Sequence, residues 1–508
     1  MAKIRTRARA VDMLGRQQIA TIQNAIAELF KNAFDAYASK VQVDYLKGVG
    51  PDVNGTLLVR DDGFGMTRED FEDKWLVLGT ESKVQESGTN PGYVPKGMTP
   101  RKITGEKGIG RLAIALLGRQ VVVFTRARRD DELHDLVVSW IHWGLFEIPG
   151  VNLDAVEFPV ETFPGGQLPT VEQMFKLREQ LVADVRKSSY YAANKQRCDK
   201  IISEIVAFSP DIAGLDGFLQ KSDDGKGMSL VGDSTGTSFL IGSVNRVLPK
   251  ELAEEDEGDG YSFRALLLGF VDPVFSQSVP QFSTSFKVWD KGSFSGTEYL
   301  DNATFFTRDE LDNSTDHFFS GEVDEFGQCT ATLRIYDKTL ENVKIPWRND
   351  KGQKTECGPF KVVFGTLQGK RSESIVGARD EKRFSDMYAK LAEIGGVYMY
   401  RDGIRILPYG GSNDTDWLEI EKRRNLGANY YFFSYRRMVG AVLLTSENNP
   451  SLREKAGREG LQKNVPYQQT RSIIKNILIQ LAAEYFRKNS DKGDFNGWIA
   501  EVNAPDLV

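Results

Sequence analysis

The strongest constraint on this 508-residue chain is a phrase near its N-terminus, ELFKNAFDA at residues 28–36. Successive helical residues lie about 100° apart, so on a helix Glu28, Asn32 and Asp35 fall within an arc of roughly 60°. One helical face therefore carries a carboxylate, a neutral amide and a second carboxylate, while apolar residues such as Leu29 face a core. A base that activates water, beside an amide that binds a metal, is what nucleotide hydrolysis needs.

A second phrase, DDGFGM at residues 61–66, follows the apolar run LLV at residues 57–59. This order predicts a strand that opens into a glycine turn. Glycines permit close backbone approach, so a carboxylate at the end of the strand can be aimed at the edge of a base. The doubled aspartate, Asp61 and Asp62, leaves two candidates for that carboxylate, and the register of the phrase favours Asp61.

Composition predicts a soluble, cytoplasmic protein of about two to four domains. The 40% of apolar residues suffice for sizeable cores, and no apolar run of about 18 residues predicts a membrane span. The basic N-terminus lacks a following apolar segment, which argues against secretion. The three cysteines, Cys198, Cys329 and Cys357, match no disulfide or zinc spacing. The net charge of −6 gives no global case for nucleic-acid binding.

The two phrases, E-x-x-x-N-x-x-D and then D-x-G-x-G-M, together resemble the GHKL ATPases. That superfamily comprises type II topoisomerase B subunits, heat-shock chaperones, sensor histidine kinases, MutL proteins and MORC proteins. Two further boxes of its pattern follow in the right order, GEKGIGRLA at residues 105–113 and TGTSFLI at residues 235–241. The resemblance implies a Bergerat-type ATP-binding sandwich whose cofactors are ATP and Mg²⁺.

The resemblance also implies a role for the residues of each box. Glu28 is the expected general base, and Asn32 is the expected Mg²⁺ ligand. Asp35 is expected to support the site through hydrogen bonds or to contact ATP. Asp61 would accept a hydrogen bond from the adenine amino group, which discriminates against guanine, and Thr237 would bind Asp61 or an ordered water.

Further nucleotide contacts are expected in the glycine turn and in the glycine box. Residues 76–110 form a long segment rich in Gly, Pro, Lys and Thr, and its position between two boxes favours a lid over ATP. Backbone N–H groups at the start of the helix near residue 111 would receive the phosphates. The remaining expected binding residues are Gly63, Gly65, Met66, Thr80, Lys83, Lys107, Gly108, Ile109, Gly110 and Arg111.

The expected fold class is α+β, with the ATP-binding sandwich first and a transducer-like α+β domain after it. We place the ATPase domain at residues 1–126 and 231–270, interrupted by an insertion at residues 127–230. The transducer-like domain, of the ribosomal S5 type, takes residues 271–490, and a tail takes residues 491–508. The insertion would shape a partner surface or elaborate the edge of the sheet.

Apolar periodicity predicts the elements of these domains. Helices are expected at residues 171–208, with a break near 188–192, and at 381–394 and 467–488; strands are expected at 329–336, 360–367 and 396–407. Charged residues at alternate positions, Lys3, Arg5, Arg7 and Arg9, predict an extended arm. In relatives such an arm crosses to a second protomer, and a solvated tail is the alternative.

Phrases in the second half, GVYMYRDGIR at residues 396–405 and REGLQKN at residues 458–464, are similar to those of bacterial MORC-like ATP-binding proteins. That resemblance implies a role in defence against phage or foreign DNA. Transducer domains of the superfamily insert a lysine that reaches the γ-phosphate. Lys370, Arg371 and Lys382 are the candidates here.

The leading hypothesis is an ATP-gated dimerising clamp with slow turnover, which drives a partner effector or engages nucleic acid. A chaperone acting on protein clients is one alternative. A protein kinase of the histidine-kinase type is another, but none of the three histidines stands in a phosphoacceptor setting. The basic and aromatic residues between 422 and 437 would serve a nucleic-acid surface or form a hydrophobic strand with charged rims.

Overall fold

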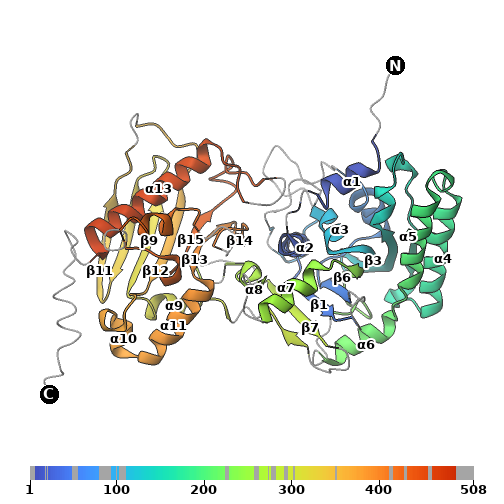
Figure 1. Cartoon of the computed structure of the whole chain (residues 1–508), viewed down its shortest axis with the longest axis horizontal. Coiled ribbons are helices and arrows are strands. Elements are labelled where there is room, and N and C mark those ends of the chain that lie inside the picture. Colours follow the sequence, from blue (N-terminus) through green and yellow to red (C-terminus); the bar gives the residue numbers. More distant parts are fainter. Residues whose placement is uncertain are drawn as a thin grey trace. The chain divides into compact units, whose positions relative to one another are not determined.

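The computed structural model divides the chain into two units (Figure 1). The first unit takes residues 1–260 and 281–302, and the second takes residues 261–280 and 303–508. The structure describes residues 6–17, 19, 21–48, 55–78, 93–98, 100–101, 110–222, 228–256, 263–272, 274–275, 282–290, 296–300, 304–348, 352–410, 416–427, 432–455 and 460–487.

The first unit is built on an eight-stranded sheet with the order β5-β4-β3-β6-β2-β1-β7-β8. Neighbouring strands are antiparallel except β1 and β7, which are parallel. The strands are β1 Lys40–Leu46, β2 Thr56–Asp61, β3 Gly118–Arg129, β4 Glu132–His142, β5 Val160–Phe163, β6 Gly236–Val244, β7 Ser283–Trp289 and β8 Thr297–Glu298.

Strand register assigns the candidate site to one face of this sheet. Asp61 of β2 and Thr125 of β3 each lie opposite Thr237 of β6, so the three residues share a face. On the same face, Phe239 stacks on Trp75 at 6.2 Å between ring centroids. The helices on this side are α1 Arg9–Leu14, α2 Ile22–Asp35, the π-helical turn η1 Asp70–Trp75, the 3₁₀ turn η3 Gly110–Ala113 and α3 Ile114–Leu117.

The helices of the segment predicted as an insertion, residues 127–230, cover the other face of the sheet, while the same segment also supplies strands β4 and β5 of the sheet itself. Its helices are α4 Val171–Lys187, α5 Lys195–Ala207 and α6 Ile212–Ser222. Phe208, directly after α5, packs edge-on against Trp140 of β4 with the ring centroids 5.8 Å apart. Phe218 of α6 packs against Trp289 of β7 at 5.3 Å. Because both faces of the central strands are buried, the sheet needs such a second layer.

The second unit contains a seven-stranded sheet with the order β11-β10-β9-β12-β15-β13-β14. Its strands are β9 His317–Val323, β10 Cys329–Ile335, β11 Lys338–Ile345, β12 Phe360–Thr366, β13 Gly396–Arg401, β14 Ile404–Arg405 and β15 Met438–Leu444. Its helices are α8 Phe263–Leu267, α9 Arg308–Asn313, α10 Ile375–Arg379, α11 Glu381–Ile394, α12 Ile420–Arg424 and α13 Val465–Leu481, which continues as the π-helical turn η11 Ala482–Phe486.

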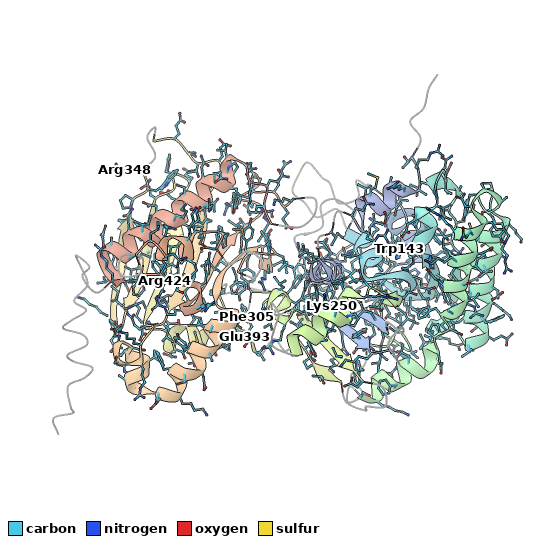
Figure 2. All side chains as sticks on the ribbon, viewed as in Figure 1. Trp143, Lys250, Phe305, Arg348, Glu393 and Arg424 are labelled. Carbon is cyan, nitrogen blue, oxygen red and sulfur yellow. The ribbon has the colours of Figure 1, made fainter. Side chains whose placement is uncertain are left out.

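Aromatic residues fill the core of the second unit. Phe486, at the end of η11, stacks on His317 of β9 at 4.8 Å, which ties the α13 side to the sheet. Phe305, labelled in Figure 2, packs edge-on against Tyr398 of β13 at 5.3 Å. The tyrosine hydroxyl donates a hydrogen bond to the carbonyl oxygen of Ile394, where α11 ends. These contacts fix the helices against the sheet.

The α+β class and most of the predicted elements are confirmed. Helix α11 has the predicted bounds, and α13 begins at Val465 where Asn464 caps it, two residues before the predicted start. The stretch 171–208 is broken after Lys187, as its pattern indicated. The predicted domain boundary at residue 270 differs from the observed division, because residues 281–302 return to the first unit, where β7 pairs with β1.

The predicted extended arm is wrong at Arg9, which begins α1. Arg7 forms a bridge with Asn152 of the same chain, and its guanidinium donates to the carbonyl oxygen of Gly150 at 2.6 Å. Lys3 and Arg5 lie outside the described residues. All three cysteines are buried free thiols. None of the described helices is long and apolar enough to cross a membrane.

Candidate active site

Helix α2 presents the first candidate residues from an almost fully buried position. The Thr21 side chain caps its start by accepting the Asn24 N–H at 3.1 Å. Glu28 is 3% exposed, and the Lys31 ammonium lies 3.6 Å from its carboxylate. Asn32 and Asp35 are half-buried. The structure therefore gives Glu28 a dry setting with a cation close by.

The turn after β2 gives the two aspartates different surroundings. Asp61 is buried, and its Oδ1 accepts the Gly63 N–H at 3.0 Å. Asp62 is exposed, and its Oδ1 accepts the N–H groups of Ser39 and Lys40, both at 2.8 Å. The Asp62 carboxylate thus fastens the start of β1, while Asp61 faces the interior beside Thr237.

The glycines of this turn permit two close approaches. A Cβ at Gly63 would lie 2.7 Å from the Ala36 carbonyl oxygen, at the end of α2. Gly65 has φ +63°, and a Cβ there would lie 2.0 Å from the Arg126 carbonyl oxygen. The Phe64 N–H also donates to the Ala36 carbonyl oxygen at 2.9 Å. The turn is thus fixed to both α2 and β3.

Thr125 is a site residue that the sequence analysis missed. Its buried Oγ1 accepts the Met66 N–H at 2.9 Å, donates to the Gly236 carbonyl oxygen at 3.2 Å and lies 3.1 Å from Thr237 Oγ1. One hydroxyl therefore connects the glycine turn with the fourth box. The available signal was a single hydroxyl in the apolar strand VVVFT, but register was needed to place it.

Thr125→Val is expected to lower the free energy of unfolding by about 2 kcal/mol, because the part-buried Met66 N–H loses its acceptor and the buried carbonyl oxygen of Gly236 loses its donor. ATP affinity should fall at the same time, since the turn and Thr237 lose their common partner. Denaturant unfolding and nucleotide titration measure the two effects. Thr125→Ser keeps the hydroxyl and is the control; equal losses in both variants would contradict the role of Oγ1.

Burial raises the pKa of Asp61 to about 7. Repulsion from Asp62 acts in the same direction, while the N–H groups of Gly63 and Thr237 favour the ionised form. Between about pH 4 and pH 7, the folded state holds a proton that the unfolded state has lost. The stability of the nucleotide-free protein should therefore fall as the pH rises through this window.

Asp61→Asn removes this titration. The free energy of unfolding of the variant, relative to the wild type, is expected to rise by on the order of 4 kcal/mol between about pH 4 and pH 8. Urea unfolding of both proteins at the two pH values measures this difference. A difference that is independent of pH would contradict a buried, titrating Asp61.

Arg129 is a second residue that the sequence analysis missed. Its guanidinium donates to the carbonyl oxygens of Phe64 at 2.9 Å and Gly65 at 3.0 Å, and to Asp70 at 2.5 Å. It also lies over the rings of Phe64 and Tyr93, at 4.8 and 4.9 Å. Burial acts to raise the pKa of Asp70, but hydrogen bonds from Lys74 and Arg129 outweigh it and lower that pKa to about 2.

The glycine box is only partly described. Gly110 begins η3, which packs against α2. The Arg111 guanidinium donates to the carbonyl oxygens of Lys74 and Trp75, so its described contacts hold the end of η1. Five predicted contacts lie outside the described residues, namely Thr80, Lys83, Lys107, Gly108 and Ile109.

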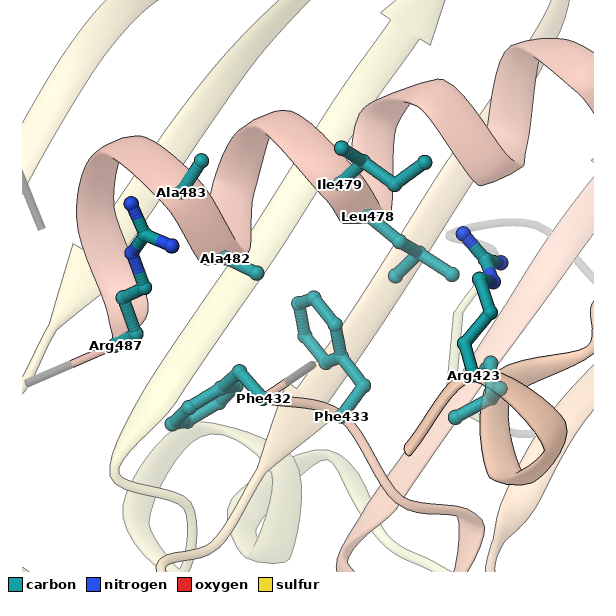
Figure 3. A pocket seen from close by; sticks show the side chains of 9 residues that line it. Arg423, Phe432, Phe433, Leu478, Ile479, Ala482, Ala483 and Arg487 are labelled. Atoms are coloured by element: carbon teal, nitrogen blue, oxygen red, sulfur yellow. The ribbon is translucent and has the colours of Figure 1, made fainter. Parts of the chain in front are cut away.

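The residues proposed to reach the γ-phosphate, and the basic and aromatic stretch, lie in two segments of the second unit. Lys370 is exposed, and its ammonium lies 3.8 Å from the Glu373 carboxylate, while Arg371 forms an ion pair with Glu381. Lys382 is exposed on α11. Among the aromatic residues between 422 and 437, Phe433 and Tyr435 are buried. Their burial, which Figure 3 shows for Phe433 beside α13, disfavours a stacking surface for bases. The predicted hydrophobic strand is nevertheless wrong in the described part of this stretch, since residues 422–424 are helical in α12 and residues 435–437 form a 3₁₀ turn.

The side chains of α2 fit a divalent cation that arrives with a nucleotide. Mg²⁺ takes one or two protein oxygens and completes its shell with phosphate oxygens and waters. The half-buried Asn32 amide and Asp35 carboxylate can supply such oxygens. Within the described ranges, no group of three or more His, Cys, Asp and Glu side chains is placed to hold a metal ion.

Comparison with known families agrees with this geometry. Residues 20–142 match the family of histidine kinase-, DNA gyrase B-, and HSP90-like ATPases. The match covers the first two boxes, the glycine box and strands β1 to β4. It supports a GHKL-type ATPase in the first unit, and thereby ATP binding and hydrolysis as the general activity.

Two other comparisons do not identify a function. A search of curated proteins gave no match. Among solved structures, the chain is similar to the crystal structure of the N-terminal domain of a DNA repair protein, at 11% identity and a TM-score of 0.42. That alignment covers 94% of this chain and 97% of the other.

Proposed function

We propose that this protein is a Mg²⁺-dependent ATPase whose active site lies in the first unit. The observation that carries the proposal is the buried carboxylate of Asp61, which lies opposite Thr237 and is held by the Gly63 N–H at 3.0 Å. The turn that follows it is hydrogen-bonded to the end of α2, the helix that bears Glu28 and Asn32. The adenine-recognition and hydrolysis elements thus belong to one connected structure.

Glu28 is the proposed general base. It takes a proton from the water that attacks the γ-phosphate, and its burial keeps bulk water from weakening that interaction. The ammonium of Lys31 lies 3.6 Å from this carboxylate. Asn32 would supply an amide oxygen to Mg²⁺, which would neutralise phosphate charge.

Asp61 sets the preference for adenine. Its carboxylate accepts a hydrogen bond from the exocyclic amino group, where guanine presents a carbonyl oxygen. Two acceptors facing each other in a buried site repel, so we expect ATP to bind much more tightly than GTP. The Thr237 N–H holds this carboxylate from the neighbouring strand β6, and Thr125 of β3 in turn contacts the Thr237 hydroxyl at 3.1 Å.

At a finer level, we propose an ATP-gated clamp that dimerises when ATP binds and opens after slow hydrolysis. The clamp acts in the cytoplasm on a partner effector or on nucleic acid. The resemblance of the second half to MORC-like proteins supports a role in defence against phage or foreign DNA. Binding energy for the γ-phosphate would shift the population from open to closed forms.

Sedimentation with and without a non-hydrolysable ATP analogue, combined with a nucleotide titration, tests both the proposed ATP site and the proposed clamp. If Asp61 recognises adenine, the ATP analogue should bind in the presence of Mg²⁺, and the corresponding GTP analogue should not bind. A change from monomer to dimer, which Glu28→Gln traps with ATP, would support the clamp. Binding without dimerisation would remove the clamp and leave the ATPase; no binding would overturn the proposed function itself.

A further inference from the structure

Helix α2 ends in a hydrogen-bonded turn of the Schellman type with tyrosine at the position where glycine is usual. The Tyr37 N–H donates to the Phe34 carbonyl oxygen at 3.0 Å. The Ala38 N–H donates to the Ala33 carbonyl oxygen at 3.1 Å. Tyr37 has φ +60°, a left-handed conformation that glycine adopts freely and other residues adopt at a cost. Such a conformation persists where the surrounding contacts hold it in place.

The contacts that hold Tyr37 come from Arg101, 64 residues along the chain. The Tyr37 hydroxyl accepts the Arg101 N–H at 3.1 Å, and the Arg101 guanidinium lies 5.4 Å from the centroid of the Tyr37 ring. The guanidinium also donates to the carbonyl oxygens of Phe34 at 3.0 Å and Ala38 at 2.8 Å. The last carbonyl groups of a helix have no following turn to supply donors, so a cation is well placed there.

The segment that carries Arg101 also contacts the glycine turn. The ring of Tyr93 packs against Phe64 with the centroids 5.6 Å apart, and its hydroxyl accepts the Asp130 N–H at 3.1 Å. Residues 93–98 and 100–101 are the described part of the expected lid between residues 76 and 110. This part is fixed to the glycine turn at one end and to α2 at the other.

We propose that Arg101 and Tyr37 are positioning residues for ATP hydrolysis, which hold the last turn of α2 in the direction that the metal site requires. Asn32 and Asp35 lie in that turn, so the direction of the helix end sets where their oxygens meet Mg²⁺ and the phosphates. Arg101 and Tyr37 act through the helix and make no contact with the nucleotide. This inference rests on the proposed ATPase and adds two residues to it.

Arg101→Met removes the guanidinium and keeps an unbranched apolar side chain. The adenine-binding carboxylate of Asp61 stays in place, so binding of a fluorescent ATP analogue in EDTA should remain close to that of the wild type. The Mg²⁺ concentration for half-maximal ATP hydrolysis should rise by about tenfold, as is typical when a group that orients a metal ligand is lost. High Mg²⁺ should recover part of the activity, whereas a misfolded fraction would lower kcat at every Mg²⁺ concentration.

Three further variants identify the contact that matters. Arg101→Lys keeps a cation at the helix end and should show a smaller change than Arg101→Met. Tyr37→Phe removes the acceptor of the Arg101 N–H, and its effect should not add to that of Arg101→Met, because both break the same contact. Lys96→Met is the control, since it removes an exposed cation of the same segment that pairs with Asp131 at 2.9 Å. The control should keep the Mg²⁺ dependence of the wild type.

An unchanged Mg²⁺ dependence in Arg101→Met, or an equal change in Lys96→Met, would overturn the positioning role and leave the ATPase standing. Failure of the wild type to bind nucleotide would overturn the ATPase itself. Amide hydrogen exchange of the nucleotide-free protein tests the contact separately. The Tyr37 and Ala38 amides should exchange about tenfold faster in Arg101→Met than in the wild type. Equal exchange rates would show that Arg101 does not hold the end of α2.

Discussion

Glu28→Gln is expected to slow ATP hydrolysis by about 10²- to 10⁴-fold while ATP binding changes little. Glutamine has nearly the same shape as glutamate but cannot accept a proton from the attacking water. Glu28 is 3% exposed and lies on a helix capped by Thr21, so the substitution leaves the surrounding packing intact. The loss should appear in kcat, since the interaction is required in the transition state.

Phosphate release and the binding of a fluorescent ATP analogue measure the two effects separately. Glu251→Gln is the matched control, because the Glu251 carboxylate also contacts α2, accepting the Gln23 side-chain amide at 2.8 Å. The control should hydrolyse ATP at close to the wild-type rate. Hydrolysis by Glu28→Gln within tenfold of the wild type would show that another group activates the water.

The local part of the site could be predicted from the sequence because it depends on short-range spacing. Glu28, Asn32 and Asp35 share a face through helical periodicity, and α11 has its predicted bounds for the same reason. Asp61 at the end of an apolar run likewise follows from local strand and turn chemistry. Each of these predictions needed only one element at a time.

The remaining contacts depend on pairing between distant segments, which a single sequence does not specify. Thr125 meets Thr237 only because β3 and β6 pair in one register, across more than a hundred intervening residues. Strand β7 returns to pair with β1, which moves residues 281–302 out of the predicted second domain. The covering role of α4 to α6 likewise follows from the second buried face of the sheet.

Arg129 illustrates why charged support residues escape a search by motif. Its sequence context, an arginine near the end of a strand, is typical of an exposed position. In the structure its guanidinium is fixed by the Phe64 and Gly65 carbonyl oxygens and by Asp70. The glycine turn of the second box therefore depends on a residue more than sixty positions away, whose role appears only when β3 is in place.

Gly65→Ala is expected to disrupt the site much more than the same change at Gly232. The two glycines have nearly equal backbone angles, φ +63° and +67°, so the left-handed strain of about 1 kcal/mol applies to both. A Cβ at Gly65 would lie 2.0 Å from the Arg126 carbonyl oxygen, whereas one at Gly232 has nothing within 4 Å. The difference between the variants therefore isolates the close approach of the turn to β3.

For Gly65→Ala we expect a loss of about 4 kcal/mol in the free energy of unfolding, because main chain must move to admit the methyl group. The displaced turn would also shift Asp61 and the Met66 N–H, so ATP affinity should fall by at least tenfold. Gly232→Ala should lose about 1 kcal/mol and bind ATP normally. Urea unfolding measures the free energy of unfolding of the two variants, and nucleotide titration measures their affinity for ATP. Equal losses would mean that strain alone, and not contact with β3, makes glycine necessary in this turn.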